Sequence, residues 1–148
     1  MKPDIELHDW PAARSEASTI RYRVFVEEQH VPAVLELDAH DPVCLHALAR
    51  TADGYAVGTG RLLPATAHAG LVCGHIGRMA VLREWRGQGV GAALLSALME
   101  AARRRGDAEI VLSAQTHAVG FYASFGFAQM GETYIEAGIP HQDMRKSL

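Results

Sequence analysis

The sequence predicts an α/β or α+β sandwich in which helices cover both faces of a mostly antiparallel sheet. Three observations support this prediction. Strand-like and helix-like periodicities alternate along the chain in the order β, α, three strands, α, β, α and further strands. Asp53-Gly54 separates two apolar segments, which is a strong hairpin signal because both central positions of a type I′ turn need positive φ. A glycine-rich turn at residues 86–91 joins a strand to a helix.

The length and composition fit one globular domain spanning residues 1–148. A net charge of −3 argues against nucleic acid or an anionic membrane as the main partner. The chain has no apolar run near the roughly 20 residues of a membrane span, and its N-terminus lacks a signal-peptide core. Cys44 and Cys73 follow no disulfide or metal-site pattern, so we expect reduced thiols, a cytoplasmic location and no metal. The oligomeric state is left open, with a homodimer among the alternatives.

Residues 1–42 are predicted to form a strand, a helix and a loop. Ile5 and Leu7 alternate with polar neighbours, which indicates a strand that ends near residues 10–11. Apolar residues from Ala13 to Val24 recur at helical spacing, so a helix with one apolar face is expected to reach about residue 28. Pro32 makes further helix unfavourable, and the loop that follows it is acidic.

The rest of the chain is predicted to contain six strands and two helices. A helix that begins near Gly89 carries arginines at residues 103–105, which suit the C-terminal end of a helix dipole, and Gly106 caps it. A second helix at residues 117–124 stops at Gly126. The predicted strands are 45–52, 55–63, 71–82, 109–114, 127–131 and 141–146, with a turn at 64–70 and a loop at 135–140.

The glycine-rich turn predicts an anion-binding site, most simply for a pyrophosphate. Its glycines let the backbone approach a ligand closely, and free N–H groups at the start of the next helix favour phosphate oxygens. Arg86 adds a cation at the mouth of the turn. A P-loop is excluded because no Gly-Lys-Ser/Thr sequence is present. Gly87, Gly89 and Ala92 match a Rossmann fingerprint, but the next predicted strand does not end in an acidic residue.

The same turn, read as Arg86-x-x-Gly89-x-Gly91, resembles motif A (R/Q-x-x-G-x-G/A) of the GCN5-related N-acetyltransferase family. Residues 115–127 resemble that family's motif B, N-x-x-A-x-x-F-Y-x-x-x-G-F, with Gln115 in place of asparagine. Within the family, the chain looks like the ElaA-like branch from residues 21–29, Glu36-x-Asp38 and residues 136–144. The likeness covers nearly the whole chain.

This resemblance implies an acetyl-CoA-dependent enzyme that moves an acetyl group directly to a primary amine of a small molecule or peptide. It also implies a sheet that splays at its fourth strand, residues 71–82, where a backbone amide near residues 79–81 polarises the acetyl carbonyl. Tyr122 is the implied acid that protonates the leaving thiolate. The implied cofactor-binding residues are Met79, Ala80, Val81, Arg86, Gly87, Gln88, Gly89, Val90, Gly91, Ala92, Gln115 and Tyr122.

His75 is the predicted general base. Strand alternation puts it on the same face as Met79 and Val81, and histidine titrates near neutrality. An exposed or structurally bonded histidine is an equally good interpretation, and an ordered water relay is a further alternative. Rival residues, either as base or as anchors for a cationic amine, are Glu27, Glu28, Glu36, Asp38 and His141.

The acceptor amine is expected to enter opposite the cofactor, on the side built by the first helix, the loop after it and the C-terminal strands. These segments are rich in carboxylates, so we expect a net negative pocket that favours a cationic amine. An anionic acceptor would instead use Arg78, with Arg21 and Arg23. The predicted acceptor-binding residues are Glu28, Glu36, Asp38, Arg78 and His141.

Two other functions are kept as alternatives. The chain could bind acetyl-CoA without catalysis, as a sensor or scaffold, although the presence of Tyr122 argues against this. The N-terminal half is also similar to acyl-homoserine lactone synthases in Arg21, Phe25 and Gly60-Arg61-Leu-Leu-Pro64. Those enzymes are longer and place a tryptophan soon after the phenylalanine, which this chain does not.

Overall fold

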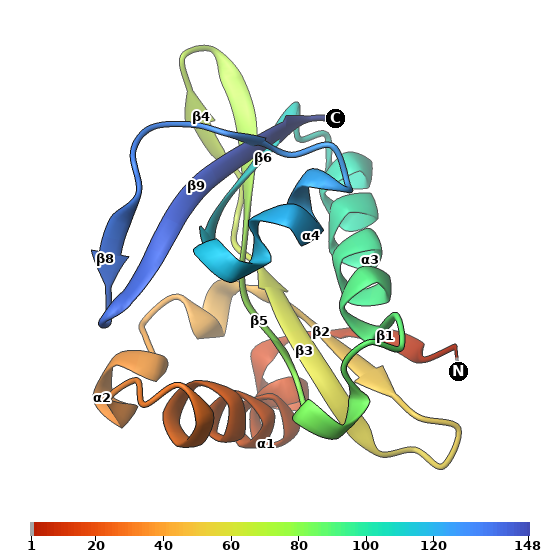
Figure 1. The fold of residues 1–148 in the computed structure, drawn as a ribbon. Coiled ribbons are helices and arrows are strands. Elements are labelled where there is room, and N and C mark those ends of the chain that lie inside the picture. The colour runs from red at the N-terminus through yellow and green to blue at the C-terminus, as the bar shows by residue number, and fades with distance from the viewer. Residues whose placement is uncertain (1) are drawn as a thin grey trace.

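A nine-stranded sheet forms the centre of the described chain (Figure 1). The structure is a computed structural model and describes residues 2–148, apart from the side chain of His68. Its strands follow the order β1-β2-β3-β5-β6-β9-β7, and every pair is antiparallel except β5 with β6. This confirms the predicted, mostly antiparallel sheet. The strands are β1 (Asp4–His8), β2 (Leu45–Arg50), β3 (Ala56–Leu62), β4 (Thr66–His68), β5 (Leu71–Val81), β6 (Glu109–Gln115), β7 (Ala128–Gln129), β8 (Tyr134–Glu136) and β9 (Ile139–Ser147).

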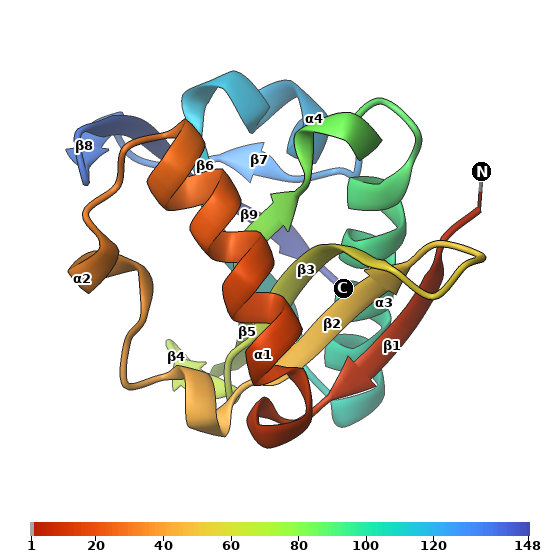
Figure 2. The same cartoon turned by 90° about the horizontal axis from the view of Figure 1, so that it is seen from below.

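Helices cover both faces of the sheet, as predicted (Figure 2). On one face α1 packs against β2 and β3, and α3 packs against the same strands on the other. α4 lies on the α3 side, because the Phe121 ring is 3.6 Å from where a Cβ on Gly91 would stand. The helices are α1 (Trp10–Arg21), α2 (Ala33–Glu36), α3 (Val90–Arg105) and α4 (Val119–Ala123), with a π-helical segment at Tyr22–Glu28 and 3₁₀ turns at Asp41–Val43, Arg83–Trp85 and Thr116–Ala118.

The first helix begins earlier than the apolar pattern suggests and changes type before it ends. Asp9 caps it, and the Asp9 carboxylate accepts a hydrogen bond from the Ala12 N–H at 3.0 Å. Regular α-helix ends at Arg21. The rest of the predicted helix is π-helical, with the Gln29 N–H bonded to the Val24 carbonyl at 3.2 Å. The spacing of apolar residues predicts a helix in this segment, but over two turns it does not distinguish an α-helix from a π-helix.

The hairpin predicted at Asp53-Gly54 is confirmed, but its turn type is different. The Gly54 N–H donates to the Thr51 carbonyl at 2.9 Å, and the Thr51 N–H donates to the Tyr55 carbonyl at 2.9 Å. Gly54 has a φ of 89°, whereas Asp53 is not among the residues with positive φ. These bonds form a tight turn followed by a glycine bulge, which needs only one residue of positive φ.

Two further hairpins lie where the sequence predicts a turn and a loop. Ala69-Gly70 joins β4 to β5 with φ values of 51° and 81°, and Ala137-Gly138 joins β8 to β9 with 51° and 77°. Two successive positive φ values in a two-residue loop are typical of a type I′ turn. Alanine is unfavourable at the first of these positions, so the usual asparagine or aspartate signal is missing from the sequence.

The sheet splays at β5, as the sequence resemblance implies. β6 pairs with β5 only at residues 73–75, whereas β3 pairs with β5 as far as Val81. Beyond His75 the two neighbouring strands diverge, and β6 continues with β9 instead (Figure 1). This divergence leaves one edge of β5 without a strand partner along residues 76–81.

A bulge at Arg78 reverses the alternation of side chains along β5. Arg78 has a φ of 51°, and the pairing with β3 shifts between Thr59 and Arg61. A Cβ on Gly60 would overlap the Met79 sulfur and stand 2.9 Å from Leu98 of α3, so Met79 faces α3. His75 lies before the bulge and faces the other side. The expectation that His75 shares a face with Met79 and Val81 is therefore wrong.

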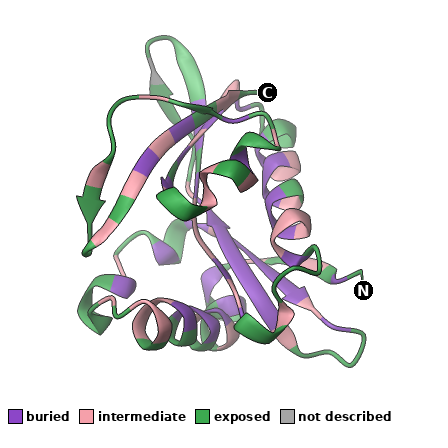
Figure 3. Cartoon of the chain, in the orientation of Figure 1, coloured by how far each residue is buried: buried purple, intermediate pink, exposed green. Residues whose placement is uncertain are grey.

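Both helical layers are held to the sheet by apolar packing (Figure 3). Ala13, Ala17 and Ile20 of α1 are buried, as are Leu94 and Leu98 of α3, at the three- to four-residue spacing of an apolar helix face. Within residues 2–148, no helix is long and apolar enough to cross a membrane.

Candidate active site

A cleft of about 1080 Å³ opens where β5 and β6 diverge. Its walls come from the π-helical segment, the α2 region, β5, the glycine turn and the start of α3, the end of β6, α4 and the β8–β9 hairpin. The predicted catalytic, cofactor-binding and acceptor-binding residues all line this cleft except Glu28 and Gln88. The alternative anchors Glu27, Arg21 and Arg23 do not line it. The structure therefore gathers almost the whole predicted site from segments that are far apart in the chain.

The glycine turn has the geometry of an anion cradle. Gly87 and Gly89 have φ values of 76° and 83°, and a Cβ on either residue would meet nothing within 4 Å. Gly89 is the N-cap of α3, a helix of 16 residues, and no side chain caps its first N–H groups. These donors and the positive end of the helix dipole suit phosphate oxygens, so the turn fits a pyrophosphate.

Arg86 bends back from the turn toward the first helix. Its Nε donates to the Val81 carbonyl at 2.9 Å, and its Nη1 lies 2.9 Å from the Glu28 carboxylate. Glu28 is therefore the partner of the predicted phosphate-binding arginine and lies outside the cleft. The Arg86 Nη2 also donates to the Glu28 carboxylate, at 3.1 Å, so all three guanidinium nitrogens have a partner within the protein. These contacts hold the turn against the π-helical segment.

Tyr122 brings a protonated hydroxyl to the cleft. The residue is only 9% exposed, and burial alone raises the pKa of its hydroxyl to about 12. The Phe121 ring contacts Tyr122 edge-on, with ring centroids 5.1 Å apart, and also packs toward Gly91. This packing fixes α4 beside the first turn of α3. A buried hydroxyl that stays protonated at neutral pH can act as a hydrogen-bond donor or general acid.

Gln115 is bonded inside the protein across the mouth of the cleft. Gln115 and Gln29 exchange hydrogen bonds, with Nε2–Oε1 distances of 3.0 and 2.8 Å, and His117 approaches the Gln115 Oε1 at 2.7 Å. The amide pair ties the π-helical segment to the end of β6. Sequence reasoning missed Gln29, because 86 positions separate the two glutamines. The predicted contact of Gln115 with the cofactor stays a prediction.

His75 stands on the wall of the cleft before the bulge. His75 is exposed to solvent in the cleft. Partial desolvation by the surrounding protein lowers the pKa of its imidazole below the usual value, and the nearby Asp143 carboxylate opposes this shift. A lowered pKa favours the neutral imidazole at pH 7, which is the form that can accept a proton. Close by, Asp143 accepts hydrogen bonds from the Ser113 hydroxyl at 2.8 Å and the Tyr134 hydroxyl at 2.6 Å. No sequence pattern indicates this second cluster.

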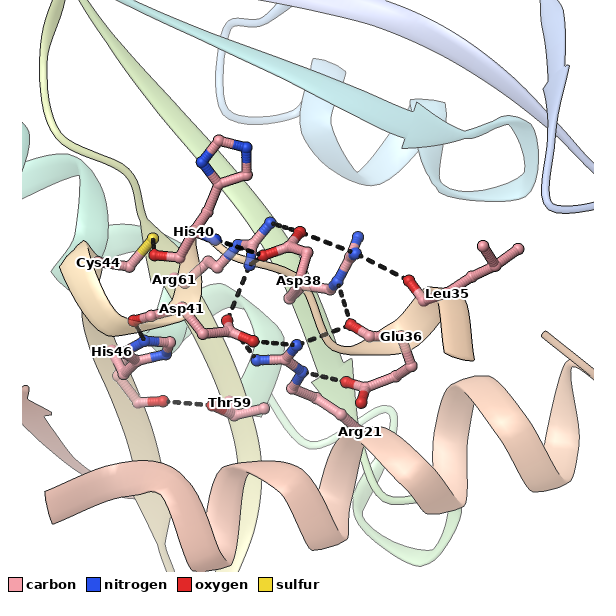
Figure 4. A network of polar contacts seen from close by, with 12 residues as sticks. Arg21, Leu35, Glu36, Asp38, His40, Asp41, Cys44, His46, Thr59 and Arg61 are labelled. Atoms are coloured by element: carbon pink, nitrogen blue, oxygen red, sulfur yellow. Dashed lines mark hydrogen bonds and ion pairs between the residues drawn. The ribbon is translucent and has the colours of Figure 1, made fainter. Parts of the chain in front are cut away.

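The acidic loop is held in a network of buried ion pairs (Figure 4). Arg21 is 1% exposed and binds both Glu36 and Asp41, the latter at 2.9 Å. Arg61 bonds to Asp41 at 2.8 Å and to both carboxylate oxygens of Asp38, at 2.8 and 2.9 Å. The network fixes the loop against α1 and β3.

Arg78 joins the same network from the bulge of β5. Its Nε donates to the Glu36 carbonyl at 3.1 Å, and its Nη2 lies 3.2 Å from Asp38. Arg61 holds the pKa of the Asp38 carboxyl well below its usual range. Burial would raise the pKa of Asp41, but Arg21 and Arg61 outweigh burial and lower it. Both carboxylates are therefore charged at neutral pH.

The charges that line the cleft are balanced among the described residues. Arginines distant in sequence neutralise much of the acidic loop, so the acceptor side is less acidic than its sequence indicates. The predicted net negative sign of that side stays a prediction, because Arg86 belongs to the cofactor side and pairs with Glu28. The three carboxylates are those of Glu36, Asp38 and Glu136, and the three guanidinium groups are those of Arg61, Arg78 and Arg86.

Glu36→Ala is expected to lower the free energy of unfolding by about 3 kcal/mol, because it leaves buried Arg21 with one carboxylate partner fewer. Urea unfolding followed by circular dichroism measures this change. Glu100 makes a comparable 2.7 Å pair with Arg103 on the exposed face of α3, so Glu100→Ala should leave the midpoint unchanged. Unchanged stability of Glu36→Ala together with a raised acceptor KM would instead make Glu36 an acceptor ligand.

Metal chemistry has no obvious location in the described chain. Within residues 2–148, no group of three His, Cys, Asp or Glu side chains is placed to hold a metal ion. The cleft offers instead an anion cradle, a buried hydroxyl and an imidazole. These groups are suited to acid–base chemistry beside a bound phosphate ester.

Comparisons with known proteins agree with this geometry. Residues 12–148 match the family model for an acetyltransferase (GNAT) domain. The chain is 36% identical over 132 residues to the uncharacterized N-acetyltransferase YjcF of Bacillus subtilis, which covers 88% of this chain and 90% of YjcF. A crystal structure of an acyl-CoA N-acyltransferase from Pseudomonas aeruginosa has a TM-score of 0.84 at 34% identity, over 98% and 99% of the two chains. Escherichia coli ElaA has a TM-score of 0.83 at 30% identity, over 97% and 99%.

The family model spans nearly the whole chain. The alignments with relatives above 30% identity cover most of this chain and most of the relatives' own length. The splayed strand and the glycine turn at the start of α3 stand where the sequence resemblance implies them. The chain therefore belongs to the GCN5-related N-acetyltransferase (GNAT) family of acyltransferases and is a homologue of Escherichia coli ElaA.

Proposed function

We propose that the chain is an acetyl-CoA-dependent N-acetyltransferase that transfers an acetyl group directly to a primary amine of a small molecule or peptide. The observation that carries this proposal is the convergence of the glycine turn and Tyr122 on one cleft. One domain, residues 1–148, would perform the reaction in the cytoplasm, where the free thiols of Cys44 and Cys73 stay reduced.

Each part of the cleft has a role in this reaction. Bound acetyl-CoA would supply the thioester, with CoA as the leaving thiolate. Residues 86–92 would hold its pyrophosphate, and a backbone N–H of residues 79–81, on the open edge of β5, would polarise the acetyl carbonyl. His75, or water beside it, would take a proton from the attacking amine. Tyr122 would donate its proton to the departing sulfur as the C–N bond forms and the C–S bond breaks.

The acceptor would lie on the wall opposite the glycine turn. Asp38, Arg78 and His141 line that part of the cleft and are the proposed contacts to the acceptor. Glu28 lies outside the cleft and pairs with Arg86. Glu36 is only 5% exposed and pairs with Arg21, so we assign both glutamates a structural role instead. The Asp38 side chain is also paired with arginines, but it is 28% exposed. In this assignment the acceptor meets carboxylates that are already paired with arginines, and the described loop residues build no free acidic anchor.

CoA-thiol release from acetyl-CoA, measured with a panel of polyamines, amino sugars, amino acids and peptides, tests the proposal. Acetylation of at least one amine, identified by mass spectrometry, is the expected result. Tight acetyl-CoA binding without turnover on any amine would favour the sensor or scaffold function. Transfer only to S-adenosylmethionine would favour the lactone-synthase alternative.

A further inference from the structure

One buried donor in the cleft wall has no partner within the protein. Arg61 is 5% exposed and lines the cleft, and its Nη atoms are bonded to Asp38 and Asp41 (Figure 4). Its Nε is the one buried side-chain nitrogen or oxygen in the described chain that makes no hydrogen bond. A buried N–H without a hydrogen-bond acceptor is unfavourable by about 1–3 kcal/mol. We therefore expect an acceptor atom to bind this N–H.

The space next to this nitrogen is open. Gly77 of β5 pairs directly with Arg61 of β3 and also lines the cleft. A Cβ on Gly77 would stand 4.0 Å from the Arg61 Nε and would meet no other described atom within 4 Å outside its two chain neighbours. The absence of a side chain at residue 77 therefore leaves a notch beside this N–H. The nitrogen itself has less than 1 Å² of accessible surface, so an oxygen in the notch reaches it only when the neighbouring side chains shift.

The charge around Arg61 favours a neutral acceptor. The network contains three arginines and three carboxylates in contact: Arg21, Arg61 and Arg78 with Glu36, Asp38 and Asp41. A carboxylate on the free N–H would add a negative charge to this balanced set in a partly buried place. A carbonyl oxygen satisfies the donor without adding charge.

The notch lies beside the predicted place of the attacking amine. His75 precedes Gly77 by two residues on the same face of β5, a distance of roughly 7 Å along the strand. In an α-amino amide the carbonyl oxygen lies about 3–4 Å from the amine nitrogen. With its carbonyl oxygen in the notch, such a molecule would therefore place its amine between Gly77 and His75. Phe25, Val31 and Leu35 line the facing wall and offer apolar contacts for a side chain.

We propose that the acceptor is an amine with an amide carbonyl on the neighbouring carbon, as in an amino-acid amide or a peptide N-terminus, and that this carbonyl binds the Arg61 Nε–H in the Gly77 notch. This inference rests on the proposed acetyltransferase function. It names the substrate class by its chemistry, and it makes Arg61 and Gly77 specificity-determining residues of the acceptor side.

Three matched probes test the proposal: leucinamide, leucine and 3-methylbutylamine, which share one side chain. Their kcat/KM values must be compared per free amine, because the α-amino group of an amide has a pKa near 8 and an alkylamine one near 10.4, while the carboxylate of leucine makes its amine more basic than that of the amide. The kcat/KM of leucinamide is expected to exceed that of 3-methylbutylamine by about tenfold or more, because a site built to bind an oxygen discriminates against the analogue that lacks it. A ratio near one overturns the proposal, and preference for leucine overturns the neutral carbonyl.

Gly77→Ala places a methyl group in the notch without a clash or an unfavourable φ. It is expected to lower the leucinamide to 3-methylbutylamine ratio about tenfold. Gly120→Ala is the matched control, because Gly120 also has ordinary φ and open space and does not line the cleft. An unchanged ratio in Gly77→Ala overturns the proposal.

A binding measurement separates failure of this inference from failure of the proposed function. In ¹H–¹⁵N spectra, the Arg61 Nε–H signal should shift on titration with leucinamide and stay in place with 3-methylbutylamine. Turnover of amines without any shift disproves the carbonyl site and leaves the acetyltransferase function intact. A shift without turnover of any amine supports the site and disproves the function.

Discussion

Gly89→Val is expected to weaken acetyl-CoA binding by at least about 100-fold while the protein stays folded. Gly89 has a φ of 83°, which a β-branched residue adopts only with strain. Relaxing that strain turns the N–H groups at the start of α3 away from the phosphate position. Losing two charge-assisted hydrogen bonds of about 1.5 kcal/mol each corresponds to a factor of more than 100 in Kd. Isothermal titration with acetyl-CoA measures the change.

The β2–β3 hairpin offers a matched control for backbone strain. Gly54 has a φ of 89°, and a Cβ there also meets nothing within 4 Å, but the residue does not line the cleft. Gly54→Val should lose a similar amount of stability, about 1–3 kcal/mol, and bind acetyl-CoA as the unchanged protein does. Wild-type affinity in Gly89→Val would show that the turn is only a connection between β5 and α3.

The cofactor side of the cleft could be predicted because its signals are local in sequence. The turn at residues 86–91 and the α4 region at residues 115–127 are each read from a single short stretch, and both lie on the cleft. The strands of the hairpin around Asp53-Gly54 were predicted for the same reason. Each of these features depends on backbone chemistry that neighbouring residues determine.

Most residues of the acceptor side could be placed from the sequence, but their partners could not, because these contacts are long-range. Arg61 meets Asp38 and Asp41 across 23 and 20 positions, and this neutralises a loop that looks acidic in the sequence. One bulge residue, Arg78, reverses the face of every later side chain on β5, which no count of alternating residues reveals. The predicted roles of Asp38 and His141 toward an acceptor stay predictions.

Tyr122→Phe is expected to lower kcat by about 100-fold and to leave the Kd for acetyl-CoA unchanged. The hydroxyl is needed only as the C–S bond breaks, so its loss removes an interaction of the transition state. The aromatic ring still fills its place against Phe121 and Phe127. Steady-state kinetics with the best amine of the panel, together with calorimetric titration of acetyl-CoA, measures both quantities.

The raised pKa of Tyr122 fixes the pH dependence that we expect for this loss. The pKa of about 12 keeps Tyr122 protonated from roughly pH 6 to 9, so the ratio of wild-type to Tyr122→Phe activity should be constant over that range. The Tyr122 hydroxyl would lose its ability to donate a proton only as the pH rises through this raised pKa. Tyr55→Phe, at a 70% exposed position on the β2–β3 hairpin, should keep full activity. A fully active Tyr122→Phe enzyme would make Tyr122 a core residue, and water would then have to protonate the thiolate.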